Sequence, residues 1–372
     1  SERIMGGMTM SQFDQSITLP SGVQLKNRLM LSPMTTQLSF FNGVITEDEI
    51  TYYKQRSKGL GAVITGAANV QDIGKGWPGE LSIAHDEMIP RLSELAKAIQ
   101  GEGAKAIIQI FHGGRMTSRA TLSGEQPVSA SAVAAKRPDA ETPRAMSEEE
   151  IVETIQAFGK ATRRAIESGF DGIELHGANT YLIQQFFSPH SNRREDQWGG
   201  SLENRYRFIE ELLTTVFSAV EQYAKKPFIV GYRFSPEEYE TPGIRFEDTI
   251  WLLERLRESK LDYLHVSLNM YDRIARSDKY NDKSILEVVH NTIQGKIPLV
   301  GVGGIRNRED VEQVLKYAEL AAIGQQMIVD PDWAEKLLEN REDEFVTKPF
   351  EEAYKELYLP SPLYNFLKAR YQ

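Results

Sequence analysis

The chain contains no cysteine among its 372 residues. This absence excludes disulfide bonds, iron–sulfur clusters held by this chain, zinc sites built on thiolates and a catalytic thiol. A chain that gains no stability from oxidation is compatible with a reducing compartment. We therefore expect a cytoplasmic protein.

Long apolar runs and excess basic charge are also lacking. No stretch approaches the ~20 apolar residues that a membrane-spanning helix requires, and the first residues, Ser1 to Met8, lack the apolar region of a secretory signal. Acidic residues outnumber basic ones by 53 to 43, which gives a net charge of −10. Neither a membrane nor a nucleic acid is expected as a partner.

Eight short apolar segments, separated by amphipathic ones, are present from residue 29 onward. They are nearly continuous in apolar residues instead of alternating, which is typical of parallel strands buried on both faces. The expected strands are 29–34, 61–67, 104–111, 170–176, 228–234, 263–268, 298–303 and 320–325.

Helical patterns occupy the intervals between these strands. The segments Thr46–Glu49 and Ser147–Glu150 each match a capping box that opens a helix. Further helices are expected at about 86–101, 202–224, 246–259, 284–293, 309–317 and 331–340.

Eight strands alternating with eight helices allow an open doubly wound sheet or a closed (β/α)8 barrel. The count favours the barrel, and no G-x-G-x-x-G follows the first strand. We predict one α/β domain over residues 1–372: a TIM barrel core over about 25–342, an N-terminal hairpin at 17–25 that closes one face, and a helical C-terminal extension over about 343–372. The long insertion at 113–146 is expected to shape the active site.

The C-terminal ends of barrel strands carry the chemistry of this fold. The residues at those ends are mostly neutral hydrogen bonders, with one arginine and several glycines. They are Ser32, Pro33, Met34, Thr35, Ala67, Gln109, His112, His176, Asn179, Tyr181, Arg233, Ser267, Gly303, Gly304, Gly324 and Gln325.

This set has no histidine cluster at metal-ligand spacing and no second acid to work with Glu174, so no metal site is expected. Glycines after the last two strands allow backbone N–H groups to approach a phosphate. Together these features indicate that a cofactor carries the chemistry.

Several structural alternatives stay open at this point. Arg233 could pair with Glu174, Asn179 could cap the next helix, Tyr181 could belong to the core, and the glycines could be simple turns. The arginines of the loop 193–207 suit an ion-pair lattice that braces the preceding loop.

The chain resembles the Old Yellow Enzyme family of FMN-dependent NADH:flavin oxidoreductases. The resemblance extends from Leu25 to the eighth strand. Its most specific part is His176-Gly-Ala-Asn179-Thr-Tyr181-Leu-Ile-Gln-Gln-Phe, followed by Ser188-Pro-His-Ser-Asn192-Arg-Arg-Glu-Asp196-Gln-Trp198-Gly-Gly-Ser201-Leu-Glu-Asn204-Arg205.

The resemblance implies a non-covalently bound FMN and NADH or NADPH as reductant. Thr35 would lie near flavin O4 and N5, Gln109 would bind the pyrimidine edge, and Arg233 would lie near N1 and O2. The remaining implied cofactor contacts are Ser32, Pro33, Met34 and Ala67 around the ring, with Gly303, Gly304, Gly324 and Gln325 at the phosphate.

It also implies the roles of the acceptor site. His176 and Asn179 would hydrogen-bond the carbonyl or nitro oxygen of an activated alkene or related acceptor, and Tyr181 would protonate its α-carbon. Gln37 would line the same site. A flavin-binding storage or sensor protein without turnover is the alternative function.

Two positions depart from common members of the family. Gln325 stands where many have arginine, so a phosphate-binding cation is missing unless another residue such as Arg306 replaces it. Thr35 stands where one bacterial branch has cysteine. The related dienoyl-CoA reductases need cysteines that this chain lacks. The C-terminal segment 363–372 could pack on its own barrel or on a partner subunit, which leaves a homo-oligomer open.

Overall fold

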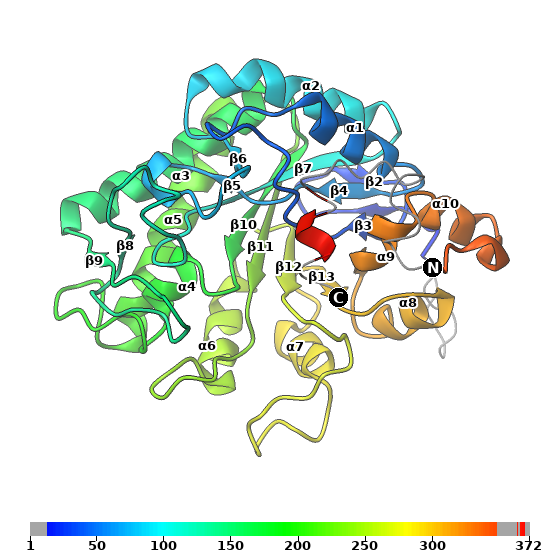
Figure 1. Cartoon of the computed structure of the whole chain (residues 1–372). Helices are drawn as coiled ribbons and strands as arrows, with labels where there is room; N and C mark the ends of the chain where they lie inside the picture. The colour runs from blue at the N-terminus through cyan, green and yellow to red at the C-terminus, as the bar shows by residue number, and fades with distance from the viewer. Residues whose placement is uncertain (1–12, 348–362, 364, 369–372) are drawn as a thin grey trace.

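The structure, a computed structural model, describes residues 13–347, 363 and 365–368. Within residues 13–347, eight parallel strands form a closed barrel with helices around it (Figure 1). The β14–β3 and β7–β10 pairings close the ring, which confirms the barrel and excludes the open sheet. In order around the barrel the strands are β3 (Leu29–Leu31), β4 (Ala62–Ile64), β7 (Lys105–Phe111), β10 (Gly172–Gly177), β11 (Ile229–Phe234), β12 (Tyr263–Val266), β13 (Leu299–Val302) and β14 (Leu320–Ile323).

The N-terminal hairpin closes one end of the barrel, as predicted. Strands β1 (Ile17–Thr18) and β2 (Gln24–Leu25) pair antiparallel. Leu19, Val23 and Leu25 join the apolar cluster inside the barrel. The Ser21 backbone N–H donates to Asp262 Oδ1 over 2.8 Å, just before β12 begins. With the N-terminal face plugged, a ligand site has room at the C-terminal face.

All the predicted helices are present, with ends that differ by a few residues. They are α1 (Glu47–Gln55), α2 (Ile89–Gln100), α3 (Glu148–Glu167), α5 (Leu202–Tyr223), α6 (Phe246–Leu256), α7 (Ile285–Ile293), α8 (Arg308–Val314) and α10 (Trp333–Leu338). The helix predicted at about 86–101 begins with a short 3-10 turn, η2 (Asp86–Met88), before α2. The sequence patterns did not predict several short elements: α4 (Leu182–Phe187), α9 (Gln325–Val329), β5 (Ala68–Asn69), β6 (Leu81–Ser82), β8 (Val128–Ser129), β9 (Arg144–Ala145), η1 (Asp72–Gly74) and η3 (Glu342–Glu344).

Of the two predicted capping boxes, one is complete and one is half formed. Ser147 and Glu150 each accept the other's backbone N–H at the start of α3. Thr46 accepts the Glu49 N–H, but the Glu49 carboxylate accepts the hydroxyls of Thr36 and Ser39 instead. Because Thr36 follows β3, this buried carboxylate ties α1 to the loop that enters the site.

The arginines of the loop 193–207 do brace the segment after β10, but mostly through backbone carbonyls. Arg194 donates to the carbonyls of Ala130 and Met146 in the 113–146 insertion and pairs with Asp196 at 2.7 Å. Arg205 donates to the Phe187 carbonyl at the end of α4. The predicted bracing is therefore confirmed. The predicted ion pairs are mostly replaced by hydrogen bonds to backbone carbonyls.

Much of the predicted C-terminal extension, residues 348–362, 364 and 369–372, lies outside the described residues, as do residues 1–12. Residues 363 and 365–368 are helical, and Leu363 and Leu367 are buried. Across the part of the chain that the structure describes, no helix combines the length and apolar character needed to cross a bilayer.

Candidate active site

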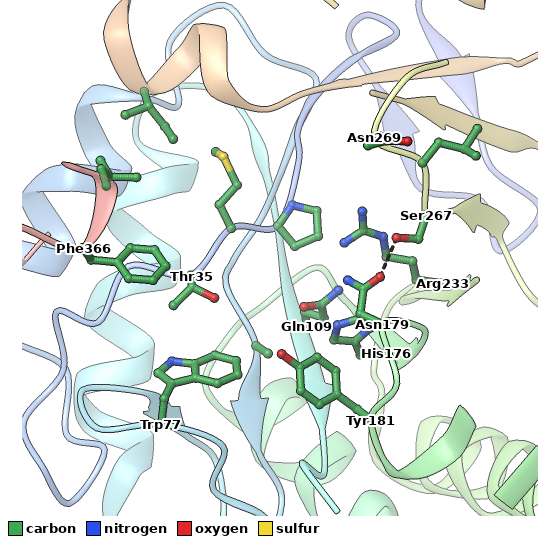
Figure 2. Close-up of a pocket in the computed structure, with 16 residues that line it drawn as sticks. Thr35, Trp77, Gln109, His176, Asn179, Tyr181, Arg233, Ser267, Asn269 and Phe366 are labelled. Atoms are coloured by element: carbon green, nitrogen blue, oxygen red, sulfur yellow. Dashed lines mark hydrogen bonds between the residues drawn. The ribbon is translucent and has the colours of Figure 1, made fainter. Parts of the chain in front are cut away.

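A cavity of about 390 Å³ lies at the C-terminal ends of the barrel strands (Figure 2). This volume falls within the roughly 300–1,000 Å³ that is usual for small-molecule sites. Ten of the strand-end residues singled out from the sequence line it: Pro33, Met34, Thr35, Ala67, Gln109, His176, Asn179, Tyr181, Arg233 and Ser267. Six further residues complete the lining: Trp77, Leu268, Asn269, Ile328, Phe366 and Leu367.

His176 lies at the end of β10, directly in register with Arg233 of the neighbouring strand β11. Burial, aided by the positive charge of Arg233, lowers the pKa of His176 to about 3. The imidazole is therefore neutral at physiological pH and carries a single N–H. Its Nδ1 has no hydrogen-bond partner among the described residues. His176 can thus offer a ligand one hydrogen bond without adding a positive charge.

Asn179 is held at both its backbone and its side chain. Its N–H donates to Ser235 Oγ over 2.9 Å, with φ at +56°. Its Oδ1 accepts from Ser267 Oγ over 2.7 Å (Figure 2). The amide nitrogen is left as the donor for a ligand in the cavity. The N-cap of α4 is Tyr181, so the alternative that Asn179 caps this helix is wrong.

Tyr181 is fixed by aromatic neighbours on the cavity wall. Its ring centroid lies 4.8 Å from Phe111 and 5.0 Å from His176, both in edge-on geometry. Trp77, in the loop after η1, lies 6.0 Å away and faces it across the cavity in Figure 2. These contacts limit the movement of the phenol while its ring remains partly exposed.

Arg233 and Glu174 are both buried but are not joined to each other. Among the described residues, no hydrogen bond or ion pair connects these two side chains. The alternative that Arg233 forms a direct pair with Glu174 is therefore wrong. Glu174 instead accepts hydrogen bonds from Gln109, Tyr263 and His265. Burial opposes its ionisation, but the neighbouring His265 and Arg233 outweigh burial and lower the pKa of Glu174 to about 2.

The glycines after β13 and β14 flank the cavity without lining it. Gly303 has φ +115°, and a Cβ there would come within 2.9 Å of the backbone of Leu268, Asn269 and Met270. Only glycine fits between these segments. Beside Gly324, a Cβ would meet nothing closer than Met34 Sδ at 3.6 Å. The open backbone at Gly324, together with the buried Arg233, whose Nε has no partner among the described residues, fits an anionic cofactor such as FMN.

The other predicted site residues are not among those that line the cavity. Ser32 is buried, and its backbone N–H donates to the Ile323 carbonyl, which extends the pairing of β3 with β14. Gln37 lines a separate hollow of about 10 Å³. Gly304 follows Gly303 with φ +69°, and Gln325 opens α9 with an exposed side chain. Arg306 is 69% exposed and lies 3.8 Å from Asp310.

The lining residues that could not be predicted from the sequence come from loops, from α9 and from the C-terminal helix. Trp77 was marked only by being an aromatic residue in a glycine-rich loop at the C-terminal face. Phe366 and Leu367 come from the C-terminal segment, whose described residues pack on their own barrel. No periodicity in the sequence places that segment over the cavity.

Among the sixteen lining residues, all in the described part of the chain, none is aspartate, glutamate or lysine. The fold and the site thus define a barrel in which a bound cofactor carries the chemistry. A family model, NADH:flavin oxidoreductase / NADH oxidase, matches residues 15–344. The chain belongs to this family, which confirms the resemblance to the Old Yellow Enzyme family, FMN as the cofactor and the NAD(P)H-dependent flavin oxidoreductases as its class.

Known proteins support this assignment. The chain is 45% identical to an NADH:acrylate oxidoreductase of Vibrio harveyi over 96% of its own length but only 36% of that relative. It is 42% identical to YqiG of Bacillus subtilis, a probable NADH-dependent flavin oxidoreductase, with 94% of both chains covered. The Old Yellow Enzyme homologue of Zymomonas mobilis has a TM-score of 0.79 and 25% identity, with 94% of this chain and 97% of that chain covered.

Proposed function

We propose that this protein transfers hydride from NADH or NADPH, by way of FMN, to the β-carbon of activated alkenes such as enones. We include quinones and nitro compounds in the proposal as further electron acceptors of the reduced flavin. The observation that carries the proposal is the joint position of a neutral His176, the Asn179 amide nitrogen and the Tyr181 phenol on one cavity wall.

The chain supplies a matching set of contacts for the cofactor. Gln109 and Arg233 would hold the pyrimidine edge, and Pro33, Met34, Thr35 and Ala67 would border the ring. Ser32, Gly303, Gly304, Gly324 and Gln325 would add backbone contacts to the ring and the phosphate; the close packing around Gly303 and the open space beside Gly324 support this role for the glycines. When bound, FMN supplies the hydride-transfer chemistry between NAD(P)H and the acceptor.

The three polar residues of the wall would act on the acceptor. His176 and Asn179 donate to its carbonyl oxygen, which draws electron density from the conjugated β-carbon and makes it electrophilic. Tyr181 gives its hydroxyl proton to the α-carbon, so that the alkene gains one hydride and one proton. Arg233 holds a fixed positive charge beside the site, which stabilises negative charge that develops on reduction.

The test is an anaerobic titration of the FMN-loaded protein with NADH and with NADPH, followed by reoxidation with cyclohexenone, acrylate, a quinone and a nitro compound. Acrylate is included because the Vibrio harveyi relative carries that activity in its name. Flavin reduction followed by reoxidation with an enone supports the proposal. Flavin that is reduced but is reoxidised by none of these acceptors would favour a storage or sensor role.

A further inference from the structure

Three side chains from two strands converge on one buried carboxylate beneath the cavity. Glu174 of β10 is fully buried. Its Oε1 accepts from the Tyr263 hydroxyl and from His265 Nδ1, each over 2.8 Å, and both donors belong to β12. Its Oε2 accepts from Gln109 Nε2 of β7 over 2.7 Å. The catalytic scheme proposed above makes no use of Glu174.

This arrangement determines which end of the Gln109 amide is available to a ligand. An ionised carboxylate only accepts hydrogen bonds, so the NH2 group of Gln109 must be the end that faces Glu174. Gln109 also lines the cavity, and its Oε1 is the polar atom left for a ligand there. The site therefore presents an acceptor at this position, and an acceptor suits the N3–H donor of a flavin pyrimidine ring.

The carboxylate also places a negative charge close to the positive charge of Arg233. Glu174 and Arg233 lie on the adjacent strands β10 and β11. Leu175, the residue after Glu174, pairs with Tyr232, and Arg233 is the next residue along β11. The low pKa of Glu174 keeps it ionised at neutral pH. Because both groups are buried, their fields are weakly screened by water. Arg233 favours an electron-rich ring in the cavity, and Glu174 opposes it.

We propose that Glu174 is a positioning residue with two effects on the cofactor. It fixes Gln109 as the hydrogen-bond acceptor for flavin N3–H, and its buried negative charge holds the reduction potential of bound FMN below the value that Arg233 alone would set. The inference rests on the FMN-dependent function proposed above.

The test compares the reduction potential and the FMN dissociation constant of the full-length protein with those of Glu174→Gln. Loss of the negative charge should raise the equilibrium constant for two-electron flavin reduction about tenfold, which is roughly +30 mV. FMN should also bind several-fold more weakly, because a neutral amide no longer dictates the orientation of Gln109.

Asp171→Asn is the matched control. Asp171 is a buried carboxylate that accepts hydrogen bonds from the Ala106 N–H and from Gln100, but it precedes β10 at the opposite end of the barrel. Its removal should lower stability and leave the flavin potential unchanged. Tyr263→Phe is a second variant, which keeps the Glu174 charge and removes one donor that disperses it. The flavin potential should then fall.

The outcomes separate the two proposals. A wild-type protein that takes up no FMN would overturn the proposed function and this inference together. If the wild type binds FMN but Glu174→Gln leaves its potential unchanged or lowers it, only the inference fails. An equal rise of the flavin potential in Asp171→Asn would also overturn only the inference. If Glu174→Gln does not fold, an unchanged or raised potential in Tyr263→Phe overturns the inference.

Discussion

The Ser267 hydroxyl donates a hydrogen bond to the Asn179 side-chain oxygen over 2.7 Å, across 88 positions of sequence. The two residues come from the ends of different strands, β12 and β10. An asparagine amide has two chemically different ends, and this contact selects which of them faces a ligand. With Oδ1 engaged, Asn179 presents its nitrogen, which suits an acceptor that carries an oxygen atom.

Ser267→Ala should therefore weaken acceptor binding. Without the hydroxyl the amide can turn over, and a hydrogen bond worth about 1 kcal/mol is lost for part of the time. We expect kcat/KM for cyclohexenone to fall about three- to tenfold, mainly through KM, while flavin reduction by NADH changes little. Stopped-flow measurement of the two half-reactions separates these effects. Ser267→Thr keeps the hydroxyl and should restore the wild-type values; equal losses in both variants would refute the orienting role.

Tyr181→Phe should separate proton donation from hydride supply. The phenylalanine keeps the ring contacts with Phe111 and His176 and removes only the hydroxyl. Alkene reoxidation of the flavin should slow by roughly 10²–10⁴-fold, the usual range for loss of a general acid. Reoxidation by a quinone, which needs no proton on carbon, should be far less affected. A uniform loss with all acceptors, or slower reduction by NADH to the same degree, would contradict the assignment.

The barrel could be predicted from the sequence because its strands are buried on both faces and leave continuous apolar runs. The polar residues at strand ends followed from the same pattern, since a strand fixes the position of its last residue. Glu49 shows where local rules fail. Its sequence position fits a capping box, but the hydroxyls of Thr36 and Ser39 offer a tertiary alternative that the pattern does not contain.

The parts of the site that could not be predicted depend on the paths of loops. Trp77 reaches the cavity because the segment after β5 folds back over the barrel, and Phe366 does so because the C-terminal helix returns to its mouth. The orientation of Asn179 depends on Ser267, and that of Gln109 depends on Glu174. These are pairings across many residues, which no local pattern encodes.

Acid should destabilise the protein well before its carboxylates titrate. Burial lowers the pKa of His112 to about 3, as it does for His176, from a usual value of 6.5. Between pH 6.5 and 3 these histidines bind protons in the unfolded chain but not in the folded chain. Their contribution to the free energy of unfolding is therefore complete above pH 6.5 and is lost as the pH decreases toward 3. Each histidine contributes at most about 1.4 kcal/mol per pH unit.

Urea denaturation at several pH values between 7.5 and 5 measures this slope. His112→Asn is a matched variant. In the wild type the Gly114 N–H donates to His112 Nδ1 over 3.0 Å, and the side-chain oxygen of an asparagine could accept the same hydrogen bond. The free energy of unfolding of the variant should fall less steeply on acidification, by up to about 1.4 kcal/mol per pH unit, which corresponds to one proton. A slope identical to that of the wild type would mean that His112 is not held neutral in the folded protein.

Gln325→Arg should strengthen FMN binding. Gln325 begins α9 directly after Gly324, and its exposed side chain leaves room for a longer one. A guanidinium there would add a charged donor for the cofactor phosphate, and hydrogen bonds to charged groups contribute roughly 1.5–3 kcal/mol. We expect FMN to bind at least about tenfold more tightly at low salt, with the gain shrinking as salt rises. Gln325→Met, of similar length and uncharged, should show no gain. The dissociation constant is measured from the fluorescence of released FMN; tighter binding in both variants, or in neither, would place the phosphate away from α9.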